Sequence, residues 1–185
     1  MYYAGSPQTW RVGYSPKQPV PFSHALHAGQ LGLDCRYCHT TVEEAATAAL
    51  PPTSICMNCH ERIAPKSDKL LLVRESFASG AAIPWVRVHK LPDFVYFDHS
   101  AHVRRGVSCV SCHGRVDQME QVVQVQPLSM AWCLDCHRNP DAHLRPPDLV
   151  TDLGWVPEQD ATTIGQQVRA QLNINPSTDC STCHR

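Results

Sequence analysis

The chain has 185 residues, a formal net charge of −1 and 18% charged residues. This balance provides neither the basic footprint of a nucleic-acid-binding protein nor an acidic tail. Fifteen prolines and only 7% aromatic residues also argue against a large conventional core, so we expect something besides side chains to fill the interior. The residues that stand out are ten cysteines and eleven histidines.

All ten cysteines fall into five copies of one pattern, C-x-x-C-H, with none left over. This pattern is typical of c-type haem attachment: two thiols on one side of a short helical turn meet the porphyrin vinyl groups, and the histidine binds the iron. Disulfide frameworks do not require a histidine after every second cysteine, and zinc sites do not repeat one pentapeptide five times. The pattern therefore predicts five haem c groups, attached at Cys35 and Cys38, Cys56 and Cys59, Cys109 and Cys112, Cys133 and Cys136, and Cys180 and Cys183, with proximal ligands His39, His60, His113, His137 and His184.

A two-haem unit occurs twice along the chain. Each copy opens with Phe-x-His-x-x-His, at 22–27 and 97–102, and each carries Pro-x-Ser ahead of its second motif. These matches predict an internal duplication. The predicted organisation is an N-terminal extended arm (1–22), di-haem module 1 (23–66), a helix and extended connector (67–96), di-haem module 2 (97–150), and a C-terminal helix with the fifth haem motif (151–185).

Two helices are predicted outside the modules. Residues 67–79 start at a good N-cap and end before Gly80, with Leu70, Leu71 and Phe77 as the apolar contacts. Residues 161–172 place three apolar side chains, at 164, 168 and 172, on one helical face. Between the modules, we expect extended stretches at 85–89 and 94–97, joined by a turn at 91–93.

Five motifs in 185 residues leave too little polypeptide for a self-sufficient core. The predicted fold is therefore mostly irregular with short α-helices: a multihaem cytochrome c wrapped around a haem core, with two duplicated di-haem modules and a C-terminal haem.

Six histidines outside the motifs are candidates for the five distal iron positions: His24, His27, His89, His99, His102 and His143. His24 and His27 stand before the first motif of one copy, and His99 and His102 occupy the equivalent positions in the other copy. These four histidines are the strongest candidates. His89 follows, and His143 is the weakest because it lies in a proline-rich loop without a counterpart in the first copy. Met119 and Met130 are alternatives, although a packing role is favoured for both.

Each histidine pair spans three residues and so shares a face of one helical turn. Two imidazoles on one face cannot bind one iron from opposite sides of the porphyrin. We therefore expect the two members of each pair to serve two different haems.

Haem attachment of this kind takes place outside the cytoplasm, so we expect the protein to be exported. The start of the sequence has no signal-peptide pattern, and no apolar run, such as Leu70–Val73, approaches the length of a membrane span. We expect the natural chain to begin further upstream.

Several longer strings resemble a known family. The Phe-x-His-x-x-His element before a C-x-x-C-H motif resembles class III multihaem cytochromes. From about residue 20 to the end, the chain is similar to the pentahaem cytochrome subunit of bacterial alternative complex III. The strings that carry this similarity are PFSH (21–24), PTSICMNCH (52–60), IPWVRVH (83–89), LPDFVYF (91–97) and CHRNP (136–140).

This resemblance implies a role in electron transfer. Electrons from quinol oxidised elsewhere in a membrane complex would pass through the haems to a monohaem cytochrome or soluble carrier, and the subunit would not be an enzyme by itself. The implied partners are membrane-integral and iron–sulfur subunits, and the implied location is the periplasmic side of the inner membrane. An N-terminal membrane helix is also implied, with Tyr2, Tyr3 and Trp10 near the membrane interface.

The resemblance to class III cytochromes further implies that the first histidine of each pair serves the next haem along the chain. His24 would then serve the haem on Cys35 and Cys38, and His99 the haem on Cys109 and Cys112; the irons reached by the second histidines stay open. Two other functions compete with the complex subunit. A free periplasmic electron shuttle is one, and a catalytic multihaem reductase is the other; six spare histidines and the absence of a C-x-x-C-K motif argue against the reductase.

Overall fold

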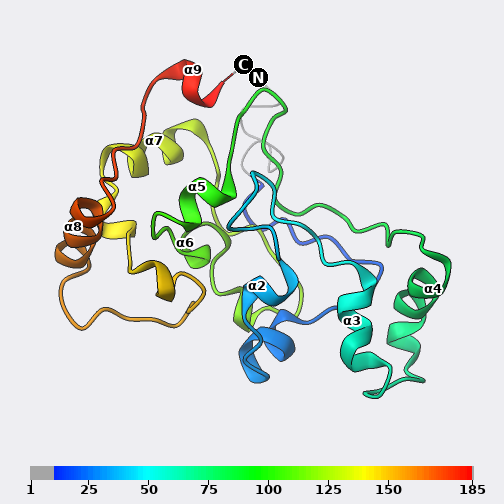
Figure 1. Cartoon of the computed structure of the whole chain (residues 1–185). Coiled ribbons are helices and arrows are strands. Elements are labelled where there is room, and N and C mark those ends of the chain that lie inside the picture. The colour runs from blue at the N-terminus through cyan, green and yellow to red at the C-terminus, as the bar shows by residue number, and fades with distance from the viewer. Residues whose placement is uncertain (1–10, 185) are drawn as a thin grey trace.

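The computed structural model describes residues 11–184 as short helices joined by long loops, and it has no β-sheet in that part of the chain (Figure 1). The helices are η1 (Ala25–Gln30), α2 (Cys35–Cys38), α3 (Thr53–His60), η2 (Asp68–Leu70), α4 (Leu71–Ser79), α5 (His99–Val103), α6 (Cys109–His113), η3 (Val116–Gln118), α7 (Met130–Arg138), η4 (Asp141–His143), η5 (Pro147–Leu149), α8 (Ala161–Gln171) and α9 (Cys180–Cys183). This matches the predicted class of short helices and irregular chain.

Each haem motif forms a helical turn, as the spacing of its cysteines predicts. Polar side chains start several of these turns by accepting a hydrogen bond from a free backbone N–H. Asp34 accepts from the N–H of Arg36 at 2.8 Å at the start of α2, and Ser129 accepts from the N–H of Trp132 at 3.3 Å at the start of α7. The two cysteines of each motif therefore lie on one side of a turn.

Within residues 11–184, buried apolar side chains form three small clusters. They consist of Val20, Met57, Val73 and Ile83; Val42, Val103 and Val150; and Leu144, Val168 and Ile174. The first cluster holds α4 against α3, at the right of Figure 1, and the third lies under α8. None of them is large enough to serve as the core of a conventional domain of this length.

The predicted helix at 67–79 is present, and Leu70 makes its predicted apolar contact, but Leu71 and Phe77 do not. The chain makes a short 3₁₀ turn first, so α4 begins at Leu71, and it ends at Gly80 with φ 74°. Leu71 is 50% exposed and Phe77 is 45% exposed, whereas Val73 is 3% exposed. The contact with α3 decides which face of α4 is buried, and that face contains Val73 and Ser76.

The C-terminal helix agrees with its prediction. Helix α8 covers Ala161–Gln171, and the Asp160 carboxylate accepts a hydrogen bond from the N–H of Thr163 at 3.0 Å. Ile164, Val168 and Leu172 all pack in the third cluster. Gly165 faces the Asp141 carbonyl oxygen of η4 so closely that no Cβ would fit between them.

The connector and the arm make few regular contacts. Within residues 11–184 the connector forms one isolated bridge, between Val95 and His184, instead of a strand, and the turn comes at 93–94, later than predicted. The arm lies beside Gln124: the N–H of Gly13 donates to the Gln124 carbonyl at 2.8 Å, and the N–H of Gln124 donates to the Tyr14 carbonyl at 3.0 Å. The three aromatic residues predicted at a membrane interface, at 2, 3 and 10, lie outside the described residues.

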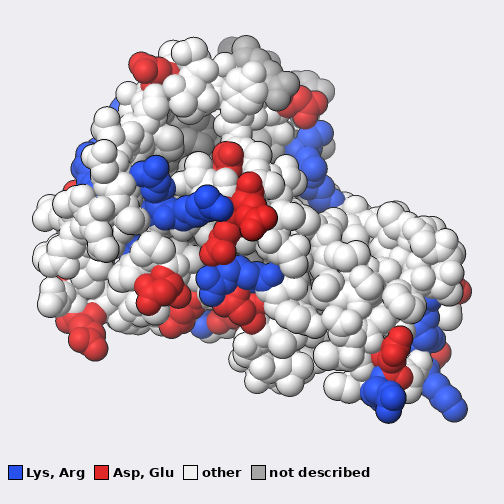
Figure 2. All heavy atoms as spheres, in the orientation of Figure 1, with Lys and Arg blue, Asp and Glu red and all other residues white. Residues whose placement is uncertain are grey.

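No helix within residues 11–184 has the length and apolar character needed to cross a membrane. On the face shown in Figure 2, Lys and Arg lie intermixed with Asp and Glu, and broad uncharged areas separate these groups.

Candidate functional site

The ten motif cysteines are free of disulfides. Eight of them are partly buried, and burial raises the pKa of Cys112 to about 11 and also raises the pKa values of Cys38 and Cys56. These groups are therefore protonated at neutral pH, which disfavours thiolate coordination of a metal by the apoprotein. Neutral thiols beside a histidine are the donor set that c-type haem attachment uses.

In six histidines, a hydrogen bond to the backbone fixes one of the two ring nitrogens. In each of them Nδ1 donates a hydrogen bond to a backbone carbonyl, which fixes the tautomer and leaves Nε2 with a free lone pair for a metal. Three are motif histidines and three are predicted distal ligands. The pairs are His39 with Ala49 (2.8 Å), His60 with Ile63 (3.0 Å), His137 with Ser177 (2.6 Å), His27 with Ser23 (2.8 Å), His99 with Ala46 (2.8 Å) and His102 with Asp98 (2.7 Å).

Two predicted distal histidines face motif histidines at the distance that one iron requires. The ring centroids of His27 and His60 are 6.1 Å apart, and those of His102 and His137 are also 6.1 Å apart. A metal–nitrogen bond of about 2 Å on each side places two imidazole centroids roughly 6 Å apart across one metal ion. The residues present therefore fit an iron held between two histidines at both places.

The third motif has two predicted distal histidines beside it. The His99 ring lies 6.5 Å from the His113 ring and is nearly parallel to it, with an interplanar angle of 9°. His89 lies only 4.4 Å from His113 in an edge-to-face contact, which leaves no room for an iron between those two rings. The geometry therefore favours His99 over His89 opposite His113.

An aromatic ring orients each histidine pair in the same way. Phe22 stacks on His27 (4.4 Å, 23°) and meets His24 edge-on (4.8 Å, 86°). Phe97 stacks on His102 at 4.7 Å and 27°, and it meets His99 edge-on at 4.8 Å and 87°. Both phenylalanines belong to the Phe-x-His-x-x-His repeat, but no orienting role was predicted for them. The repeated spacing in Phe-x-His-x-x-His was the signal for this role.

Burial keeps several of these imidazoles neutral. It lowers the pKa of His24 to about 4, with smaller contributions from His39 and His27. It lowers the pKa of His113 to about 3, with further contributions from neighbouring histidines, His89 first. Nδ1 of His24 and Nε2 of His89 are buried without a hydrogen-bond partner among the described residues. A neutral imidazole with an unsatisfied nitrogen is suited to bind a metal.

The remaining predicted ligands are less well placed. His143 is exposed in η4, and Met130 is 65% exposed at the start of α7. Met119 is partly buried, and its carbonyl accepts from the N–H of Ala25 at 3.0 Å. The His184 ring of the fifth motif lies 5.8 Å from the Phe94 ring.

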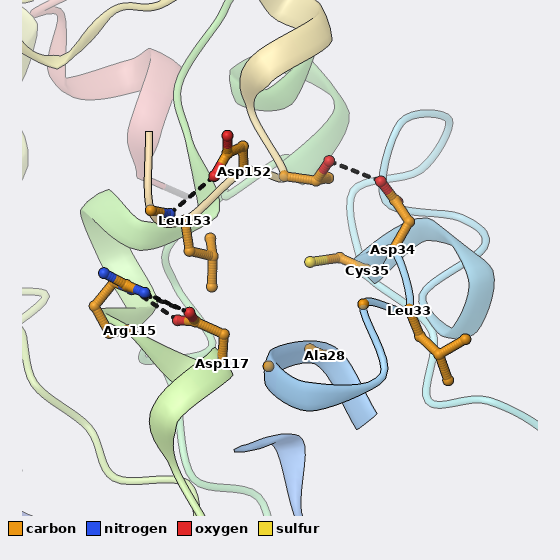
Figure 3. Close-up of a pocket in the computed structure, with 12 residues that line it drawn as sticks. Ala28, Leu33, Asp34, Cys35, Arg115, Asp117, Asp152 and Leu153 are labelled. Carbon is orange, nitrogen blue, oxygen red and sulfur yellow. Dashed lines mark hydrogen bonds and ion pairs between the residues drawn. The ribbon is translucent and has the colours of Figure 1, made fainter. Parts of the chain in front are cut away.

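A cavity of about 390 Å³ lies beside the first motif, and Figure 3 shows the Cys35 sulfur pointing into it. Its wall combines the η1 turn, the start of α2, η3 and residues 151–154. On the far side Arg115 and Asp117 form an ion pair at 2.6 Å. The volume falls within the range of small-molecule sites, and the thiol makes the cavity suitable for part of a covalently bound porphyrin.

Comparisons with known proteins point to the same chemistry in both parts of the chain. The family described as class III cytochrome C matches residues 5–83, and the family described as cytochrome c7 and related cytochrome c matches residues 95–185. A curated relative, the multiheme cytochrome c subunit of menaquinone reductase from Nitratidesulfovibrio vulgaris, is 36% identical over 102 residues. That match covers 54% of this chain and 48% of the relative, so the chain spans about half of the relative's length. Both parts of the chain are therefore similar to families of c-type cytochromes, and one stretch is similar to a multiheme cytochrome c subunit.

Proposed function

We propose that this chain is the five-haem electron-transfer subunit of a membrane complex of the alternative complex III type. It receives electrons from quinol oxidised elsewhere in the complex and passes them towards a periplasmic cytochrome or another acceptor. The observation that carries the proposal is the facing of His27 with His60 and of His102 with His137, both at 6.1 Å. An iron held by two histidines has no open position for a substrate, so the chain carries electrons and is not an enzyme by itself.

Five haems follow from the five motifs, and the two histidine pairs support the duplicated modules. When bound, haem iron supplies a one-electron redox couple. The chain's own residues hold and orient that group. The cysteines anchor the porphyrin, the backbone carbonyls of Ser23 and Asp98 fix two distal imidazoles, and Phe22 and Phe97 stack against the same rings. This fixed environment lowers the reorganisation that accompanies electron transfer.

The partners and the location follow from the resemblance and are part of the proposal. The partners are membrane-integral and iron–sulfur subunits of a quinol-oxidising complex, together with a monohaem or soluble electron carrier. The chain lies on the periplasmic side of the inner membrane, and an N-terminal helix attaches it to the membrane. The relative's name, a menaquinone reductase subunit, supports association with a quinone-linked complex.

The relative's name, menaquinone reductase, also supports electron flow in the opposite direction. In a menaquinone reductase, electrons would run through the haems towards quinone instead of away from quinol. The haem ligands described here serve either direction equally well. Purification from native membranes, followed by reduction assays, separates the possibilities.

The native protein is tagged, purified from membranes in mild detergent, and its partners are identified by mass spectrometry. We expect membrane-integral and iron–sulfur subunits to co-purify, and added menaquinol to reduce the haems of the complex. The isolated chain is the control, because without its partners it lacks a quinol site and stays oxidised on the same time scale. Recovery of the chain alone from the periplasmic fraction would show a free shuttle. Haems that menaquinol leaves oxidised, but that pass electrons to a quinone analogue, would show the reverse direction.

A further inference from the structure

The first and second motifs are direct neighbours. The side-chain amide of Asn58, within the second motif, donates to the hydroxyl of Tyr37, within the first, at 3.1 Å. The helical turn η1 bridges the same two motifs, because His27 faces His60 and His24 lies near His39.

The first motif also touches the third, although the second lies between them in the sequence. The thiols of Cys35 and Cys109 are close neighbours, and each shifts the pKa of the other. Hydrogen bonds reinforce the contact: the Thr151 hydroxyl donates to the Asp34 carboxylate at 2.8 Å, and the neighbouring Val150 carbonyl accepts from the N–H of Cys109 at 3.3 Å. The junction between the two modules is therefore the pair of motifs one and three.

The third, fourth and fifth motifs continue the row. Helix α5 bridges the third and fourth, because His99 faces His113 at 6.5 Å and His102 faces His137 at 6.1 Å. The fourth motif meets the fifth where His137 donates to the Ser177 carbonyl at 2.6 Å, since Ser177 also bonds Thr182, within the fifth motif, at 3.0 Å. Figure 1 shows the motif helices in the corresponding spatial sequence α3, α2, α6, α7 and α9.

The most exposed cysteines belong to the two motifs at the ends of this row. Cys59 of the second motif and Cys180 of the fifth are the two exposed motif cysteines; the other eight are partly buried. Ser108, which caps the third motif in the middle of the row, is only 1% exposed. The two ends of the row are thus open, and its centre is enclosed.

We propose that the five haems are held in a row in the order of motifs two, one, three, four and five, and that electrons enter and leave at the exposed second and fifth motifs. This inference rests on the five haems of the proposed function. Passage between the modules then runs through the first and third haems at the Cys35–Cys109 contact. The second haem is an end of the row, not a step between the first and the third.

Nuclear Overhauser spectra of the fully haem-loaded, reduced, diamagnetic chain test the order without any variant. Each haem is assigned to its motif through contacts of its thioether groups with labelled cysteines. We expect inter-haem cross-peaks between motifs two and one, one and three, three and four, and four and five. Cross-peaks that join motif two to motif three, with none between one and three, would overturn the proposal.

Exposure is tested on the same sample with a soluble paramagnetic gadolinium chelate. We expect the haem methyl signals of motifs two and five to broaden most and those of motif three to broaden least. The strongest broadening at motif three would contradict the assignment of the ends. Mass spectrometry of the sample counts the haems separately. A count below five would therefore count against the proposed function, while the order of the attached haems stays measurable.

Discussion

Replacing His27 with alanine should change the second haem and no other. The His27 ring lies 6.1 Å from the His60 ring, its Nδ1 donates to the Ser23 carbonyl at 2.8 Å, and Phe22 stacks on it at 4.4 Å. Its loss removes one axial ligand but neither thioether bond, so the haem stays attached while its iron becomes high-spin. One of five haems is affected, so about one fifth of the low-spin signal should disappear.

Electron paramagnetic resonance and optical spectra of the oxidised protein measure the low-spin fraction, and mass spectrometry checks that the haem count is unchanged. His24→Ala should convert a different haem, because its imidazole lies near His39 instead of His60. The double variant should therefore lose about two fifths of the signal. Leu26→Ala is the matched control: this side chain lies on the same turn, is 42% exposed and should leave the spectra unchanged. Single variants that alter the same haem, or a double variant that loses only one fifth, would refute the bridging arrangement.

Three further predictions concern stability and ligation. Val73→Ala should lower the free energy of unfolding by roughly 1–3 kcal/mol, because Val73 is only 3% exposed and packs in the first cluster. Leu71→Ala is the control: Leu71 is 50% exposed, so its loss should change that free energy by no more than about 0.5 kcal/mol. Denaturant titrations measure both values. The hydrogen bonds and charge of Arg36 lower the pKa of Asp34 from 3.8 to about 2, so this carboxylate stabilises the fold above pH 4 and the effect is lost as the pH falls towards 2. Acid titration of Asp34→Asn should therefore show a shallower loss of stability in that window; an unchanged slope would count against this ion pair. The oxidised spectrum should lack a sulfur–iron charge-transfer band, because Met130 is 65% exposed, and a resolved band would show methionine ligation.

Local features of the fold were predictable from the sequence. The C-x-x-C spacing predicts a helical turn, and the structure forms one at each motif. The apolar spacing at 161–172 predicts a helix whose boundaries differ by one residue from the observed Ala161–Gln171. These features depend on neighbours along the chain, which is why a sequence reveals them.

Features that depend on distant contacts were harder to predict. Leu71 and Phe77 were wrongly expected to be buried, because the contact of α4 with α3, through Val73 and Met57, decides which side is covered. The spacing of His24 and His27 shows that they share a face, but it does not show that His27 faces His60. Cys35 and Cys109 are far apart in the sequence but close in space, and no local pattern encodes this contact.

The central claim is that five haems are attached covalently through all ten cysteines. Mass spectrometry of the denatured, fully matured protein tests it most directly, together with titration of free thiols. We expect a mass increase of five haems and no reactive thiol, because each motif holds two cysteines on one helical turn beside a histidine. Four or fewer haems in a fully matured sample, or free thiols at any motif, would contradict the claim.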